Sequence, residues 1–112
     1  MIVTGGYNVY PKEVEIELDL IPGVAESAVF GVAHPDFGEA VSAAVIRLAA
    51  ATAHADFELT EAALLSRLRS RLAGYKCPKR VVFVDELPRN AMGKVMKNVL
   101  REQFANLYQV PT

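Results

Sequence analysis

Two runs rich in valine and alanine, residues 24–33 and 39–49, constrain the fold more than any other feature of this sequence. The pentapeptide His-Pro-Asp-Phe-Gly separates them, and proline and glycine in such a short segment are typical of a turn. Because β-branched side chains favour extended backbone, the two runs predict a pair of strands joined by this turn. The other elements have to pack against the sheet that these strands begin.

Helices are predicted before and after this pair of strands, because apolar residues recur there at helical spacing. The first helix begins at Pro11 and is ended by Pro22-Gly23. Thr60 caps the second and Gly74 stops it, and a third amphipathic segment closes the chain. The predicted core residues are Val14, Leu18 and Ile21 in the first, Leu64, Leu65, Leu68 and Leu72 in the second, and Val99, Leu100, Phe104, Leu107 and Tyr108 in the third.

Extended segments at 2–11 and 81–84 complete the pattern, and a polar loop is expected at 51–59. Strands and helices are interspersed without repeats, which predicts an α+β fold with helices packed on a small mixed sheet. The chain of 112 residues, 52% of them hydrophobic, fits one domain spanning 1–112. The longest apolar run is far shorter than the roughly 20 residues of a membrane span, and no signal peptide is recognisable, so we expect a cytoplasmic protein.

The charge is divided unevenly along the chain, although the net charge is only -1. Residues 1–66 contain two basic and ten acidic side chains (2 - 10 = -8), whereas residues 67–112 contain ten basic and three acidic ones (10 - 3 = +7). An anionic ligand is therefore expected at the C-terminal half. No aromatic and basic stacking motif typical of nucleic-acid recognition is present, so a small phosphorylated ligand is favoured over nucleic acid.

The sequence offers no metal-binding motif. Cys77 is the single cysteine, and the two histidines, His34 and His54, lie far from it, so neither a disulfide nor a ligand cluster is predicted. Cys77 is expected in the core or at its edge. His34 and Asp36 are interpreted as turn residues, and His54 has no recognisable partner.

The pair Gly93-Lys94 follows a loop stiffened by Pro88. It is not a Walker-type phosphate loop, because Pro88 stands where the first glycine is needed and Val95 where a Ser or Thr must bind magnesium. Two interpretations remain: a solvated surface lysine, or an ammonium group presented to a carboxylate or phosphate.

The pair Gly5-Gly6 also allows two interpretations. Two adjacent glycines form a tight turn, and they also let a ligand approach the backbone closely. A third glycine at the spacing of a dinucleotide fingerprint is absent.

Taken together, the segments TGGYNVYPKEVE, GVAESAVFGVAHPDFGEAVSAAVI and YKCPKRVVFVDELPRNAMGKVMKNVLR resemble the C-terminal domain of the adenylate-forming superfamily, over nearly the whole chain. This superfamily comprises acyl- and aryl-CoA synthetases, peptide-synthetase adenylation domains and luciferases. The sequence of these segments is most similar to that of synthetases of medium-length or dicarboxylic acids, such as malonyl-CoA synthetases.

The resemblance implies a two-step reaction with ATP and CoA as cosubstrates, in which this domain is a swinging lid. In the first step a carboxylate attacks the ATP α-phosphate to give an acyl-adenylate and pyrophosphate. The family's lysine at this step, which enters the site and contacts carboxylate and nucleotide oxygens, corresponds to Lys94. Acetylation of Lys94 by a protein lysine acetyltransferase would remove this charge.

In the second step the CoA thiol displaces AMP after the domain has rotated. The resemblance places Gly5, Gly6, Tyr7 and Asn8 along the pantetheine channel, with Lys76, Lys79 and Arg80 as candidate contacts of the CoA phosphates. Some relatives carry a second catalytic lysine at the position of Gly5, which this chain lacks. Glu13 corresponds to the motif's first acidic position and is expected to be structural.

The resemblance also implies a large N-terminal domain that supplies the nucleotide loop, the acyl pocket and the Mg²⁺ ligand. The 112 residues alone are therefore expected to be inactive and to self-associate through the face that would contact this domain. A stand-alone, non-catalytic interaction or regulatory module acting in trans is the alternative that the sequence leaves open.

Overall fold

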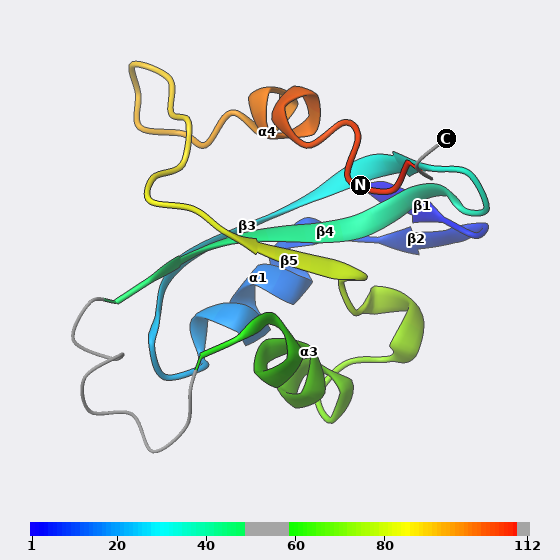
Figure 1. Ribbon diagram of the computed structural model, residues 1–112, viewed down its shortest axis with the longest axis horizontal. Helices are drawn as coiled ribbons and strands as arrows, with labels where there is room; N and C mark the ends of the chain where they lie inside the picture. The colour runs from blue at the N-terminus through cyan, green and yellow to red at the C-terminus, as the bar shows by residue number, and fades with distance from the viewer. Residues whose placement is uncertain (49–58, 110–112) are drawn as a thin grey trace.

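A computed structural model of the chain describes residues 1–48 and 59–109 and shows one mixed sheet with helices on both faces (Figure 1). In chain order the elements are β1 (Ile2–Thr4), β2 (Tyr7–Val9), α1 (Pro11–Asp19), β3 (Val24–His34), β4 (Gly38–Arg47), α3 (Glu61–Arg69), the 3₁₀ turn η1 (Gly74–Lys76), β5 (Arg80–Phe83) and α4 (Lys97–Gln103). The predicted α+β class is confirmed. His54 and residues 51–58 of the predicted loop lie outside the described residues.

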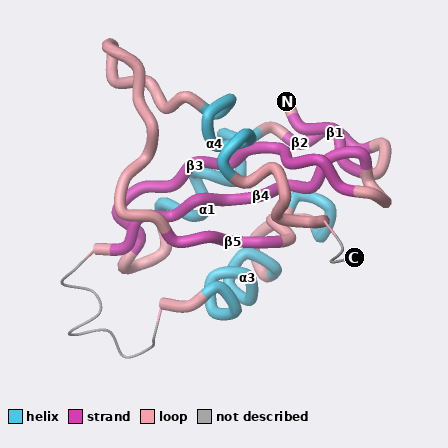
Figure 2. The backbone as a smooth tube through the Cα atoms, turned by 45° about the horizontal axis from the view of Figure 1, so that its top comes forward, coloured by secondary structure: helices cyan, strands magenta, loops and turns pink. Residues whose placement is uncertain are grey.

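Strand β4 is the central strand of the sheet (Figure 2). Its antiparallel partner β3 lies along one edge, in a register that runs from Val24 opposite Arg47 to His34 opposite Gly38. On its other edge, β1 pairs with the beginning of β4 through Thr4 and Gly38, and β5 runs parallel to the later residues of β4. Strand β2 pairs with β1 at the border. The strand pair predicted from the Val- and Ala-rich runs is therefore the longest pair of the sheet, and the other strands are built onto it.

The two faces of the sheet carry separate apolar clusters. Helices α1 and α3 cover one face, and α4 lies over the other (Figure 1). Alternate residues of β4 serve the two sides: Val41, Ala43 and Val45 pack towards α1 and α3, whereas Ala44 belongs to the α4 side with Leu100. This alternation follows from the period of two residues in a strand and gives a three-layer domain.

The first predicted helix is confirmed, with Pro11 at its start and Val14 and Leu18 fully buried. Thr60 caps α3 as predicted, since its side-chain oxygen accepts a hydrogen bond from the Ala63 amide at 3.1 Å. Gly74 does not stop this helix, so that prediction is wrong. Helix α3 ends at Arg69, where the Ser70 hydroxyl donates to the Arg67 carbonyl at 2.8 Å. The side chain satisfies a helix-end carbonyl before the glycine is reached.

The predicted C-terminal amphipathic segment is helical only from Lys97 to Gln103. Phe104, Leu107 and Tyr108 follow in a series of turns and still pack against the α4-side cluster. Within residues 1–48 and 59–109, every helix is too short or too polar to span a bilayer.

Candidate functional sites

Lys94 lies near the end of a narrow loop, residues 85–96, that connects β5 to α4. The two arms of this loop meet in an antiparallel bridge between Arg89 and Val95. The Met96 amide also donates to the Pro88 carbonyl at 2.8 Å and closes the base. The segment is therefore a small hairpin, although its sequence predicts only a turn.

The side chain of Asn90 organises the tip of this hairpin. Its Oδ1 accepts hydrogen bonds from the amides of Met92 at 2.9 Å and of Lys94 at 3.0 Å. The backbone amide of Asn90 in turn donates to the Lys94 carbonyl at 2.9 Å. Gly93 completes the turn with a φ of 84°, which few other residues adopt without strain. The backbone of Lys94 is thereby held from both of its peptide groups.

The ammonium group of Lys94 takes no part in these contacts, which involve only its backbone. Lys94 is exposed, and among the described residues its Nζ makes no ion pair or hydrogen bond. The nearby basic residues differ: Arg89 pairs with Glu26, and Lys97 Nζ lies 2.8 Å from Glu15 Oε2. Lys94 therefore presents a charge that no described side chain neutralises.

The uneven charge of the sequence is largely balanced by the fold. Each ion pair among the described residues joins a base from the C-terminal half to an acid from the N-terminal half: Arg71–Glu17, Lys76–Glu13, Arg80–Glu61, Arg89–Glu26 and Lys97–Glu15. At least five of the ten C-terminal basic residues are therefore paired with acids of the N-terminal half. The excess of basic residues therefore does not by itself identify an anion-binding site. The expectation of an anionic ligand at the C-terminal half has to be argued for each basic residue separately.

Gly5 and Gly6 form the turn between β1 and β2, with φ angles of 55° and 86°. Thr4 and Tyr7 face each other across this turn, and the Gly5 amide donates to the Phe37 carbonyl at 3.0 Å. The turn interpretation of the two glycines is confirmed. It leaves their bare backbone exposed to solvent.

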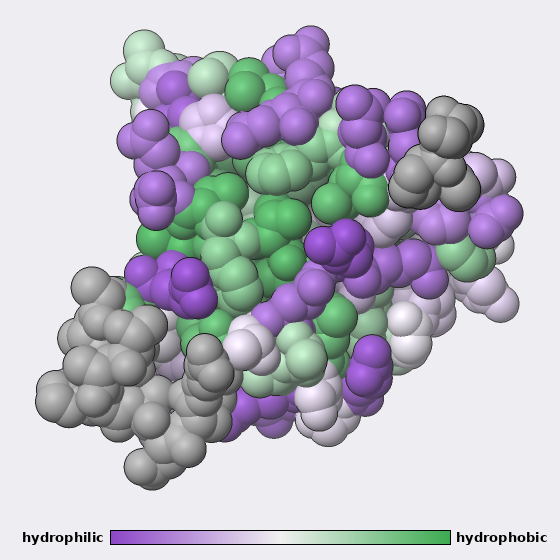
Figure 3. All heavy atoms as spheres, in the orientation of Figure 1, coloured by the Kyte–Doolittle hydropathy of each residue, from purple (hydrophilic) through white to green (hydrophobic). Residues whose placement is uncertain are grey.

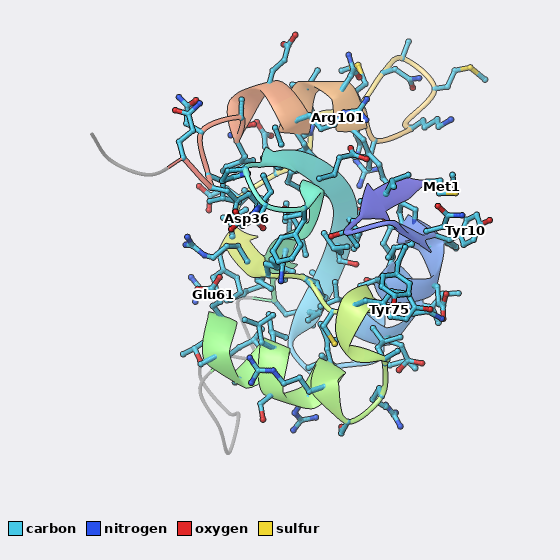
Figure 4. All side chains as sticks on the ribbon, turned by 90° about the vertical axis from the view of Figure 1, so that its right-hand side faces the viewer. Met1, Tyr10, Asp36, Glu61, Tyr75 and Arg101 are labelled. Carbon is cyan, nitrogen blue, oxygen red and sulfur yellow. The ribbon has the colours of Figure 1, made fainter. Side chains whose placement is uncertain are left out.

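A groove of about 200 Å³ lies beside this turn. Its walls come from three chain segments and consist of Thr4, Gly5 and Tyr7, Phe37 and Val41, and Gly74, Tyr75, Cys77 and Lys79. Tyr7 and Tyr75 stack with ring centroids 4.7 Å apart. Tyr75 projects on the side of the molecule that also carries Tyr10, at the end of β2 (Figure 4). The groove can therefore hold a narrow, partly apolar chain against exposed backbone.

The three basic residues expected near this groove differ in their surroundings. Lys76 Nζ lies 2.6 Å from Glu13 Oε1, and this hydrogen bond raises the pKa of Lys76 above 10.5. Arg80 Nε lies 2.9 Å from Glu61 Oε2. Lys79 lines the groove with its Nζ 4.2 Å from the centre of the Phe37 ring, a cation–π contact, and forms no ion pair with a described residue.

The two candidate sites lie at opposite ends of the domain. In Figure 1 the loop that carries Lys94 rises at one end, above the sheet, whereas the β1–β2 turn lies at the other end. The structure thus brings Gly5, Tyr7 and Lys79 together in the groove and leaves Lys94 apart from them. Asn8 is exposed on β2, opposite Val3.

Sequence reasoning missed Phe37 and Tyr75 as parts of the groove. Tyr75 directly precedes Lys76, a candidate contact of the CoA phosphates. No spacing rule, however, indicates that the Tyr75 ring would meet Tyr7, which is far away in the sequence. Within the described ranges, no group of three or more His, Cys, Asp or Glu side chains is placed to hold a metal ion.

Comparison with known proteins gives a consistent family assignment. Residues 13–94 match the family described as "AMP-binding enzyme C-terminal domain". The chain is 45% identical over 104 residues to the feruloyl-CoA synthase of an Amycolatopsis species, covering 93% of this chain and 20% of that protein. It is 42% identical over 106 residues to the long-chain-fatty-acid CoA ligase FadD13 of Mycobacterium tuberculosis, covering 94% and 20%.

Solved structures give the same picture. The apo structure of MatB from Rhodopseudomonas palustris is 56% identical, with a TM-score of 0.88, over 96% of this chain and 20% of that one. A fatty acyl CoA synthetase from Mycobacterium tuberculosis is 40% identical, with a TM-score of 0.84. The chain spans about a fifth of the length of the relatives that it matches.

Proposed function

Because this chain belongs to the AMP-binding enzyme C-terminal domain family, we propose that it is the mobile lid of a longer acyl-CoA synthetase. In this proposal a large N-terminal domain binds ATP, with Mg²⁺, and the acyl substrate, and the present domain completes its active site twice. The observation that carries the proposal is the unpaired ammonium of Lys94, held on a structured and exposed hairpin.

Lys94 acts in the first step, when acyl-adenylate forms. A carboxylate oxygen of the substrate bonds to the α-phosphorus of ATP, and the bond from that phosphorus to the leaving pyrophosphate breaks. Two anions approach each other in this step, so a cation placed between them stabilises the transition state without forming a covalent bond. An ammonium with no counter-ion among residues 1–48 and 59–109 suits this role better than the paired Arg89 or Lys97.

The groove beside the β1–β2 turn acts in the second step. The sulfur of CoA bonds to the acyl carbonyl carbon, AMP leaves with the electrons of the broken carbon–oxygen bond, and the thiol proton is released. Gly5, Gly6, Tyr7 and Asn8 would line the passage of the pantetheine arm. Of the candidate phosphate contacts, Lys79 is the best suited, because Lys76 and Arg80 are already paired with Glu13 and Glu61.

The opposite positions of the two sites support an alternation between two orientations of the lid. A single active site in the N-terminal domain would meet the Lys94 hairpin first and the glycine turn after a rotation. For the acyl substrate we propose a small dicarboxylate such as malonate, since MatB, a malonyl-CoA synthetase, is similar to this chain at 56% identity.

The experiment that tests the proposal measures the two half-reactions separately in the full-length enzyme. Lys94→Ala should lower the rate of adenylate formation by about 100-fold or more, in the range found when one preorganised charge is removed from an active site. Thioester formation from supplied acyl-adenylate should change little. Arg101→Ala, which removes an exposed charge from α4, is the control. Equal losses in both half-reactions would reject the assignment of Lys94.

Acylation of Lys94 is a proposed form of regulation. The side chain is exposed at the end of a hairpin, where a protein lysine acetyltransferase can reach it. Acetylation would remove the charge and should reproduce the defect of Lys94→Ala. Mass spectrometry after treatment with such an enzyme, combined with the adenylation assay, tests this.

A further inference from the structure

The guanidinium group of Arg89 connects the Lys94 hairpin to the sheet. Its Nη1 donates to the Gly93 carbonyl at 2.8 Å, and its Nη2 donates to Oε2 of Glu26 on β3. The Gly93 carbonyl belongs to the peptide bond that joins Gly93 to Lys94. A planar group with several fixed donors can satisfy both acceptors at once, which a lysine ammonium does less well.

The other hydrogen bonds of the hairpin have a different effect. The contacts made by Asn90, the Arg89–Val95 bridge and the bond from Met96 to Pro88 all join residues of the hairpin to one another. They fix its shape and leave its orientation on the domain undetermined. Apolar packing of Leu87 and Val95 holds only its base.

The position of Glu26 ties the contact with Arg89 to the sheet. Glu26 lies in β3 directly after the register shift between Val24 and Glu26, and it pairs with Ile46 of β4. The strand is also attached to α1, because the backbone amide of Val29 donates to Glu15 at 2.8 Å and the hydroxyl of Ser27 donates to Asp19 at 2.7 Å. A side chain anchored on this strand moves with the sheet.

We infer that Arg89 and Glu26 form a clamp that orients the hairpin and thereby positions Lys94 for adenylate formation. Arg89 is a positioning residue in this scheme and does not itself touch the substrate. The inference rests on the proposed role of Lys94. Its structural part, that the clamp restrains the hairpin, can be tested without any activity.

The structural part is tested by backbone ¹⁵N relaxation in the 112-residue chain. Glu26→Gln and Arg89→Ala should lower the order parameters of Met92, Gly93 and Lys94 and leave those of β3 and β4 unchanged. Arg71→Ala, which breaks the ion pair with Glu17 on α1, is the control and should not affect the hairpin. Unchanged order parameters in both clamp variants would overturn the inference, whatever the enzyme does.

The functional part is tested by the half-reactions in the full-length enzyme. Arg89→Ala should reduce the rate constant of adenylate formation by about tenfold, with little change in the KM for ATP, because a displacement of about 1 Å can cost up to about 100-fold. Arg89→Lys should recover only part of this loss, since it restores the charge but not the two-pronged contact. Full recovery by lysine would show that charge alone matters and would contradict the clamp.

Thioester formation should be unaffected in these variants, which separates positioning from general destabilisation. If Lys94→Ala abolishes adenylate formation while Arg89→Ala behaves like the unmodified enzyme, the clamp is rejected and the proposed function stands. If Lys94→Ala retains full adenylation activity, the proposed function fails, and the relaxation data still decide whether the clamp exists.

Discussion

Glycines with positive φ stand in both candidate sites, at 55° for Gly5, 86° for Gly6 and 84° for Gly93. An L-residue in this region costs roughly 1–2 kcal/mol. The sequence predicts that these glycines make turns, because glycine is typical of turns. It does not predict their φ angles, which depend on the strands and hairpin arms that each turn has to join.

Gly6 and Gly74 offer a matched test of this strain. A Cβ added at either position would meet no atom within 4 Å, but only Gly6 has a positive φ. Gly6→Ala should therefore lower the free energy of unfolding by about 1 kcal/mol, whereas Gly74→Ala should leave it unchanged or raise it by up to about 1 kcal/mol. Urea unfolding of the chain measures both. Equal losses at the two positions would argue against backbone strain as the cause.

Cys77 was predicted to lie in the core or at its edge, and it is partly buried against the α1 and α3 side. Burial raises the pKa of the Cys77 thiol above its ordinary value of 9.0, and the nearby positive charge of Arg69 offsets part of this effect. The thiolate therefore appears at higher pH in the folded chain than in the unfolded one.

Two measurements follow from this shift. The pH at which alkylation of Cys77 reaches half of its maximal rate should be higher in the folded chain than in urea. Because the unfolded chain loses its proton first, this thiol also lowers the free energy of unfolding as the pH rises above 9.0, up to the folded pKa. A folded midpoint at or below the unfolded one would contradict the burial of this side chain.

The β3–β4 pair was predictable because both strands are long and rich in valine and alanine, and a turn segment separates them. The helix ends were less predictable. Gly74 carries the usual signal of a helix end, yet the hydrogen bond of Ser70 ends α3 five residues earlier than this signal. After Gln103, apolar spacing continues without helical backbone, since Phe104 and Tyr108 reach the sheet from turns.

Tyr108 shows how the segment after α4 is attached to the sheet. Its hydroxyl lies 2.8 Å from the hydroxyl of Ser42, which is fully buried on β4. Tyr108→Phe should lower the free energy of unfolding by about 1 kcal/mol, the usual net contribution of one hydrogen bond. The control is Tyr10→Phe, because Tyr10 is 59% exposed. Urea unfolding that gave the same small change for both variants would contradict a structural role for Tyr108.

At the scale of the whole domain, the architecture could be predicted from the sequence, but the pairing of its charged residues could not. Ion pairs such as Lys76–Glu13 and Lys97–Glu15 join residues far apart in the sequence, so their partners become apparent only once the sheet brings the two halves together. Lys94 could be proposed as a candidate site residue from its motif, because a single loop carries the whole motif. The groove was not, since Tyr75, Phe37 and Tyr7 come from three separate segments.

One face of the domain retains apolar side chains between the α4 layer and the α3 layer, with polar residues around them (Figure 3). The α4-side cluster includes partly buried residues from the strands and from the loop after β5, namely Ile46, Val82, Val84 and Val95. Self-association of the chain in the absence of an N-terminal domain stays a prediction. Sedimentation coefficients that rise with protein concentration would support it, and one constant value would count against it.

The central claim is that one small domain serves two chemical steps with two opposite surfaces. The most direct test measures both half-reactions in two variants of the full-length enzyme, Lys94→Ala and Gly5→Ala, since Gly5 lines the groove. We expect a crossed result: the lysine variant loses adenylate formation and keeps thioester formation, and the glycine variant shows the reverse. If both variants lose the same half-reaction, or if both lose the two steps equally, the two surfaces do not divide the chemistry and the account is wrong.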